Sequence, residues 1–164
     1  MKQTHKSILN QSIYTLILCN LIFAQVEITK LIDRVDLDGT SRKYLLDDIE
    51  PYTGEVLYRY NNGEYEFKGK MLDGLQDGHW IWNYENGQKE QEGFFNNFAQ
   101  DGFWQWWYPN GQIKQEGEFQ KGVKHGTWSM WHSNGVVSSA EPYRSGKLEG
   151  KLILWFDSGQ KEGE

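Results

Sequence analysis

A spacing of 24 residues between glycines is the feature that most constrains this 164-residue chain. Two series keep this spacing over five units without an insertion, and the second series follows the first by nine residues. The first is Gly54, Gly78, Gly102, Gly126 and Gly150, and the second is Gly63, Gly87, Gly111, Gly135 and Gly159. Two further series are partial: Gly69, Gly93, Gly117 and then Glu141; and Gly74, Phe98, Gly122 and Gly146. Such a period indicates a repeat protein whose glycines have structural roles, in turns and beneath packed aromatic rings.

Aromatic residues alternate with other residues inside the units. Trp80 and Trp82 are separated by one residue, and Trp104 and Trp106 repeat the pattern 24 residues later. A period of two predicts a strand with one buried face. We therefore expect Trp80, Trp104 and Trp128 to form a ladder in the core, as a structural part of the repeat.

Asn-Gly pairs end these strands, at Asn62-Gly63, Asn86-Gly87, Asn110-Gly111 and Asn134-Gly135. Asn-Gly favours a type I′ turn, so each unit is predicted to be one β-hairpin. Because an isolated hairpin is marginally stable, neighbouring units must pair side by side. The predicted fold is all-β: an elongated single-layer antiparallel meander of five β-hairpin repeats over residues 53–164, starting near residues 53, 77, 101, 125 and 149. Residues 25–52, with an Asp38-Gly39 turn, are predicted to be an N-terminal capping hairpin.

The first 24 residues have a different composition. A basic start with Lys2 and Lys6 precedes an apolar run, and Ala24 offers a cleavage point. This layout predicts a secretory signal peptide at 1–24 and an exported protein, periplasmic, in the cell envelope or secreted. Two alternatives are a lipoprotein with Cys19 as the acceptor and an uncleaved anchor. Cys19 is the only cysteine, so a mature chain from Gln25 would contain no disulfide.

Charge and residue placement argue against several function classes. The mature chain would carry 15 basic and 23 acidic residues, a formal charge of −8. Such an acidic chain is a poor match for nucleic acid or for an anionic membrane. The histidines His79, His125 and His132 are scattered, so we expect no metal site. The sequence contains no phosphate-binding loop motif, so we expect no cofactor. The acids before the unit glycines, Asp77, Asp101 and Glu149, repeat with the period, whereas catalysis needs one asymmetric cluster. We therefore expect no enzyme.

The chain resembles the MORN-repeat family over residues 51–164, in the bacterial variant form labelled the YwqK-type antitoxin family. The residues that carry the resemblance recur in register: Gly78, Trp80, Tyr84, Asn86-Gly87, Glu92-Gly93 and Phe95, then Gly102, Trp104, Tyr108, Asn110-Gly111, Glu116-Gly117, Phe119 and Gly122. The segment 51–56 is similar to the opening unit of that family. The resemblance implies a chain of β-hairpins, and its antitoxin label implies a toxin as partner.

Three further tryptophans share one repeat position: Trp107, Trp131 and Trp155. They are out of phase with the core ladder, so they should point to the opposite face of the sheet. There they could form a partner-binding stripe, or they could pack within a coiled sheet. We expect an exported, non-catalytic module that binds a protein or acts as a scaffold. The alternatives are an antitoxin that neutralises a toxin and a carbohydrate-binding module of the cell envelope.

Overall fold

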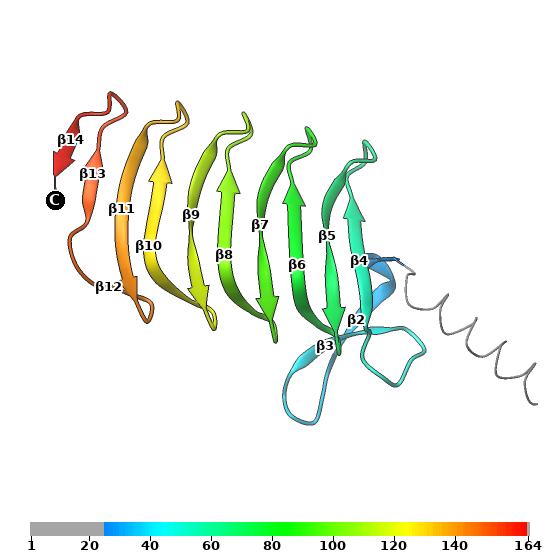
Figure 1. Ribbon diagram of the computed structural model, residues 1–164. Coiled ribbons are helices and arrows are strands. Elements are labelled where there is room, and N and C mark those ends of the chain that lie inside the picture. Colours follow the sequence, from blue (N-terminus) through cyan, green and yellow to red (C-terminus); the bar gives the residue numbers. More distant parts are fainter. Residues whose placement is uncertain (1–24, 164) are drawn as a thin grey trace, which may run out of the picture.

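A computed structural model describes residues 25–163 (Figure 1). The predicted signal peptide and the lipid-acceptor alternative at Cys19 lie outside the described residues.

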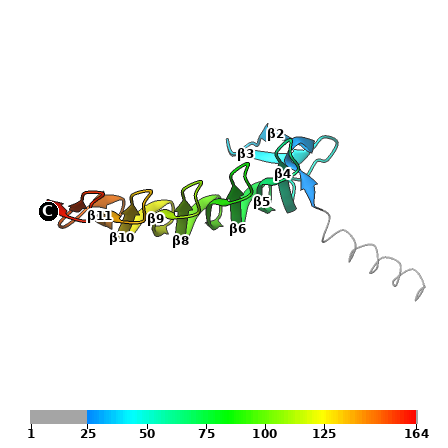
Figure 2. The same ribbon diagram turned by 90° about the horizontal axis from the view of Figure 1, so that it is seen from above.

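Consecutive antiparallel strands build one 12-stranded sheet, which confirms the predicted meander of hairpins. Its strands are β4 (Gly54–Arg59), β5 (Tyr65–Leu72), β6 (Leu75–Asn83), β7 (Lys89–Asn96), β8 (Ala99–Trp107), β9 (Ile113–Gln120), β10 (Val123–Trp131), β11 (Val137–Arg144), β12 (Lys147–Leu148), β13 (Ile153–Trp155), β14 (Lys161–Gly163) and β1 (Val26–Glu27). β1 pairs with β4 and forms the one parallel pair within the described chain. Figure 2 shows that the repeats form a single layer.

The N-terminal segment folds over one end of this layer. After β1, a short 3-10 helix η1 (Ile28–Lys30) leads into β2 (Leu31–Val35), which pairs with β3 (Ser41–Leu45) in a separate two-stranded sheet. Figure 2 shows this hairpin lying against the sheet near β4 and β5. Leu31 joins Val56, Met71 and Trp80 in a buried apolar cluster, so the hairpin contributes to the core beneath it.

The Asn-Gly turns are not type I′, and that expectation is wrong. The backbone φ of each turn Asn is not positive, whereas Gly87 has φ +80°. The Gly87 amide donates to the Tyr84 carbonyl and the Tyr84 amide donates to the Gln88 carbonyl. This is a three-residue loop, a type I turn followed by a glycine bulge, which the same Asn-Gly pair also fits.

Turns with the type I′ signature occur at the other end of each hairpin. Two successive residues with positive φ connect β5 to β6, β7 to β8, β9 to β10 and β11 to β12. These pairs are Asp73-Gly74, Asn97-Phe98, Lys121-Gly122 and Ser145-Gly146. The partial fourth glycine series therefore occupies these turns.

The first four glycines of the first series lie within strands or at a strand end, and Gly150 lies in the bend between β12 and β13. Gly78 has φ +67° inside β6, where the pairing of β5 with β6 shifts register between Lys68 and Lys70. Gly102 and Gly126 have the same conformation in β8 and β10. Each of these glycines allows a bulge that kinks its strand.

The third glycine series provides bare backbone beneath the indole rings. A Cβ at Gly69, Gly93 or Gly117 would lie closer than 3.0 Å to the ring of Trp80, Trp104 or Trp128, respectively. Those rings are 2%, 1% and 0% exposed, although the sheet is a single layer. We call the face that carries them the core face and the other the outer face.

Candidate protein-binding surface

The core face is held together by aromatic packing along the sheet. The ring centroids of Trp82 and Trp104 are 6.0 Å apart, and those of Trp106 and Trp128 are 5.6 Å apart. Phe119 meets the Trp128 ring edge to face at 4.9 Å. The buried indoles also donate hydrogen bonds to backbone carbonyls, as Trp104 does to Phe94 at 3.1 Å. These aromatic rings pack against one another and form the core ladder.

The pairing of the strands places Trp107, Trp131 and Trp155 on the outer face. Trp107 directly follows Trp106, whose indole nitrogen donates to Gln91 on the core face. Successive residues of a strand point to opposite faces. The same argument holds for Trp131 in β10 and Trp155 in β13, which each end their strand as Trp107 does. All three side chains are half-buried.

Two aliphatic residues complete a row that the sequence alone did not reveal. Trp107 pairs with Ile113 across β8 and β9, and Trp131 pairs with Val137 across β10 and β11. Both aliphatic residues stand two positions after an Asn-Gly pair, which is the signal that could have identified them. We call Trp107, Ile113, Trp131, Val137 and Trp155 the outer stripe. It crosses five neighbouring strands, about 19 Å at ~4.8 Å per strand.

The backbone of the outer stripe is fixed by side chains of the preceding unit. Tyr84 donates to the Trp107 carbonyl at 2.7 Å, and Tyr108 donates to the Trp131 carbonyl at 2.8 Å. His132 occupies the same position for Trp155, with its Nε2 2.9 Å from the carbonyl. Burial raises the pKa of Tyr84, so its hydroxyl remains a donor at neutral pH. The backbone that carries the three rings is therefore held in place by the fold itself.

The first ring of the stripe already carries a cation. The Lys89 ammonium lies 4.8 Å from the centre of the Trp107 ring and 2.8 Å from the Glu92 carboxylate. His79 also approaches Glu92, at 3.5 Å. In the next units the position of Lys89 is taken by Ile113 and Val137, so the stripe becomes apolar toward β11.

The residues that precede the unit glycines make contacts within the fold. Asp101 accepts a hydrogen bond from the Lys121 amide at 3.0 Å, and Thr53, one position of the same series, does so from the Asp73 amide. At these two positions the side chain thus supports the type I′ turn. Glu149 forms an ion pair with Arg144 at 3.0 Å. Over residues 25–163, no three His, Cys, Asp or Glu side chains gather as metal ligands.

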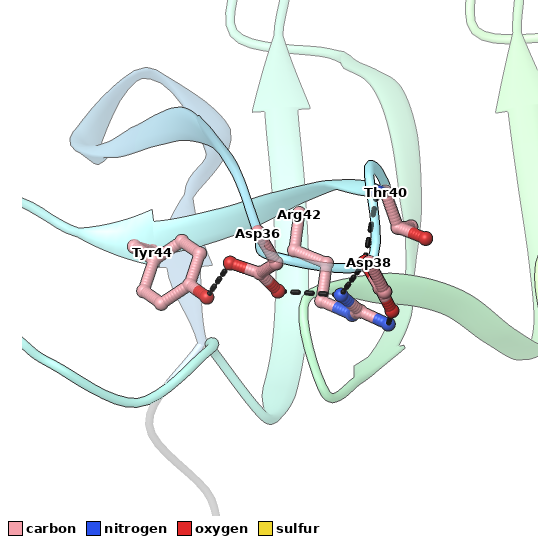
Figure 3. A network of polar contacts seen from close by, with 5 residues as sticks. All are labelled: Asp36, Asp38, Thr40, Arg42 and Tyr44. Atoms are coloured by element: carbon pink, nitrogen blue, oxygen red, sulfur yellow. Dashed lines mark hydrogen bonds and ion pairs between the residues drawn. The ribbon is translucent and has the colours of Figure 1, made fainter.

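A polar network in the β2–β3 hairpin was not anticipated (Figure 3). Arg42 contacts both Asp36 and Asp38, at 2.5 Å and 2.8 Å. Hydrogen bonds from Tyr44 and then Arg42 lower the pKa of the Asp36 carboxyl. Arg42, followed by the Thr40 amide, likewise lowers the pKa of Asp38. The network holds the hairpin loop in place, and the Arg42 guanidinium is neutralised by the two carboxylates.

None of the helical segments among residues 25–163 has the length and apolarity needed to cross a membrane.

Comparison with known proteins identifies the repeat. A search of curated proteins finds no match to the chain. The family described as MORN repeat variant matches residues 76–97, 100–121 and 124–145, which cover β6 to β11. The match concerns the repeat, and the YwqK-type antitoxin label stays a prediction. The chain therefore carries three consecutive MORN repeats of the variant type, at the centre of its sheet.

Proposed function

We propose that this chain is a non-catalytic protein-binding module that contacts its partner through the outer stripe. The supporting observation is a row of three tryptophans with two aliphatic residues between them, on the face opposite the buried ladder. Tryptophan is enriched among residues that dominate binding energy in protein interfaces. A fixed backbone lowers the entropy lost on binding.

The dimensions of the outer stripe favour an extended segment or a flat protein surface. About 19 Å equals the length of roughly six residues in an extended chain. The sheet adds area on both sides, as a protein interface of about 800 Å² per partner needs. A repeat surface of this kind supplies area and shape complementarity.

The proposal includes export of the mature chain from Gln25, so the partner would be an extracytoplasmic protein. An antitoxin role is one form of the same proposal, with a toxin as the bound protein. N-terminal sequencing of the protein recovered from its native cells tests the export step: a chain that begins at Gln25 supports it, and one that retains residues 1–24 contradicts it.

Affinity capture with matched variants tests the binding surface. The wild type should retain a partner that Trp107→Ala and Trp131→Ala lose, because both remove rings from the stripe. Phe103→Ala is the control, since Phe103 is an exposed aromatic residue of the same strand as Trp107 that lies outside the stripe. Capture of the same partner by all four proteins would contradict the proposal.

A further inference from the structure

Phe98 occupies a position where the other units have glycine. The turns at the same repeat position use Gly74, Gly122 and Gly146, with φ between 73° and 80°, and Phe98 adopts φ 55°. A bulky side chain in this region is uncommon and strained. The Phe98 amide donates to the Gln76 carbonyl at 3.0 Å, as Gly122 does to Gln100 at 2.8 Å. Glycine would therefore form the same turn without the strain.

The Phe98 ring stands outside the aromatic ladder. It is 59% exposed and makes no ring contact with any residue of 25–163. Phe95, three residues earlier, instead packs against Trp80, Trp82 and Trp104. A strained turn residue whose ring is largely exposed indicates a role outside folding.

Two hollows meet at Phe98. The larger, ≈ 590 Å³, lies between the β2–β3 hairpin and the core face and has Phe67, Trp80 and Trp82 in its wall. The second, ≈ 450 Å³, is lined by residues that include Leu72, Asp73 and Asp77. Both hollows share Leu75, Gln76 and Phe98. We call them together the junction groove.

The charges available in the junction groove are negative. Lys43 is paired with Asp33 at 2.8 Å, and Arg42 is held by the hairpin aspartates. Asp73 and Asp77 have no ion pair among the described residues. Aromatic walls with two unpaired carboxylates complement a ligand that combines an apolar group with a cation.

We propose that the junction groove binds a short basic and apolar peptide segment of a partner protein. An apolar side chain of the segment rests against Phe98 and Trp82, and a Lys or Arg reaches Asp73 and Asp77. The site is independent of the outer stripe, which begins at Trp107 and lies on the other face. It occurs once in the described chain, because a single turn of the series carries Phe and the hairpin covers that end.

Nuclear magnetic resonance titration of the full chain tests the site with a defined probe. The capped peptide acetyl-Lys-Leu-Lys-Leu-Lys-amide should shift the resonances of Leu75, Phe98 and the Trp82 indole. Acetyl-Glu-Leu-Glu-Leu-Glu-amide, its charge-reversed counterpart, should not. Shifts centred on Trp131 instead of Phe98, or equal shifts with both peptides, would overturn the proposal. So would shifts at Phe98 with cellobiose and none with the basic peptide, which would assign the groove to a sugar.

Phe98→Gly separates binding from folding. We expect a melting temperature equal to or above that of the wild type, because the strain is removed, and binding of the basic peptide at least ten-fold weaker. Asp73→Asn combined with Asp77→Asn should weaken it similarly without a change in fold. A lower melting temperature for Phe98→Gly, or unchanged affinity, would show that the ring serves the structure alone.

Discussion

At the scale of single residues, the account depends on pairs of tryptophan and glycine. Trp104 is 1% exposed in a single-layer sheet because its ring rests on the backbone of Gly93 and its edges meet neighbouring rings. The fifth unit has neither partner, since Leu152 and Glu141 stand at the equivalent positions. Where the indole is missing, the bare backbone is missing as well.

Gly93→Ala should lower the free energy of unfolding by about 1–3 kcal/mol, because the new methyl group overlaps the Trp104 ring. In a Trp104→Leu background the same substitution should cost much less, since the overlapping ring is gone. Urea unfolding of the four proteins in this double-mutant cycle measures the coupling. Equal costs in both backgrounds would contradict the stacking.

At the scale of elements, the hairpins are joined by a ladder of turn side chains. Asn62 donates to the Glu85 carbonyl at 2.7 Å and accepts from the Glu64 amide at 3.0 Å. Asn86, Asn110 and Asn134 repeat both bonds in the following turns. Each turn therefore stabilises itself and the next turn.

Asn62→Ala should lower the free energy of unfolding by about 1 kcal/mol, as it removes both bonds. Asn61→Ala in the same loop is the matched control, because no hydrogen bond of its side chain occurs among residues 25–163. Thermal melts compare the two. If both substitutions have the same effect, the ladder contributes nothing to stability.

The sequence predicted these elements because glycine spacing and aromatic alternation are local signals. It misplaced the type I′ turns, since Asn-Gly fits both a two-residue and a three-residue loop, and no Asn-Gly pair marks the turn at Asp73-Gly74. Ile113 was missed as part of the outer stripe, because its place two residues after an Asn-Gly pair identifies its partner only once the bulge between Trp106 and Trp107 is known. The junction groove depends on the β2–β3 hairpin folding over the core face. This is a long-range contact that no repeated motif in the sequence signals.

At the scale of the whole molecule, stability is a sum over similar units that contact their neighbours. Each hairpin pairs with the hairpins on either side of it, from β4 to β14. The period is invariant, so one unit should be interchangeable with the next. The two faces, in contrast, differ: tryptophan rings on the core face are buried, and those on the outer face are half-buried.

Deletion of residues 101–124 should give a folded, shorter protein, because His125 then takes the place of Asp101 and the register is kept. Deletion of 101–123 shifts every following side chain by one position and exchanges the two faces. Circular dichroism melts should show a cooperative transition for the first protein and loss of it for the second. Cooperative unfolding of both would contradict the register.

The division between the two faces is tested most directly by comparing melting temperatures of four single variants. Trp104→Ala and Trp128→Ala should cost about 3–5 kcal/mol each, as buried aromatic side chains do. Trp107→Ala and Trp131→Ala should cost less than half as much, because their half-buried rings lie on the outer face. Equal losses in all four would place the outer stripe in the core and contradict its role in binding.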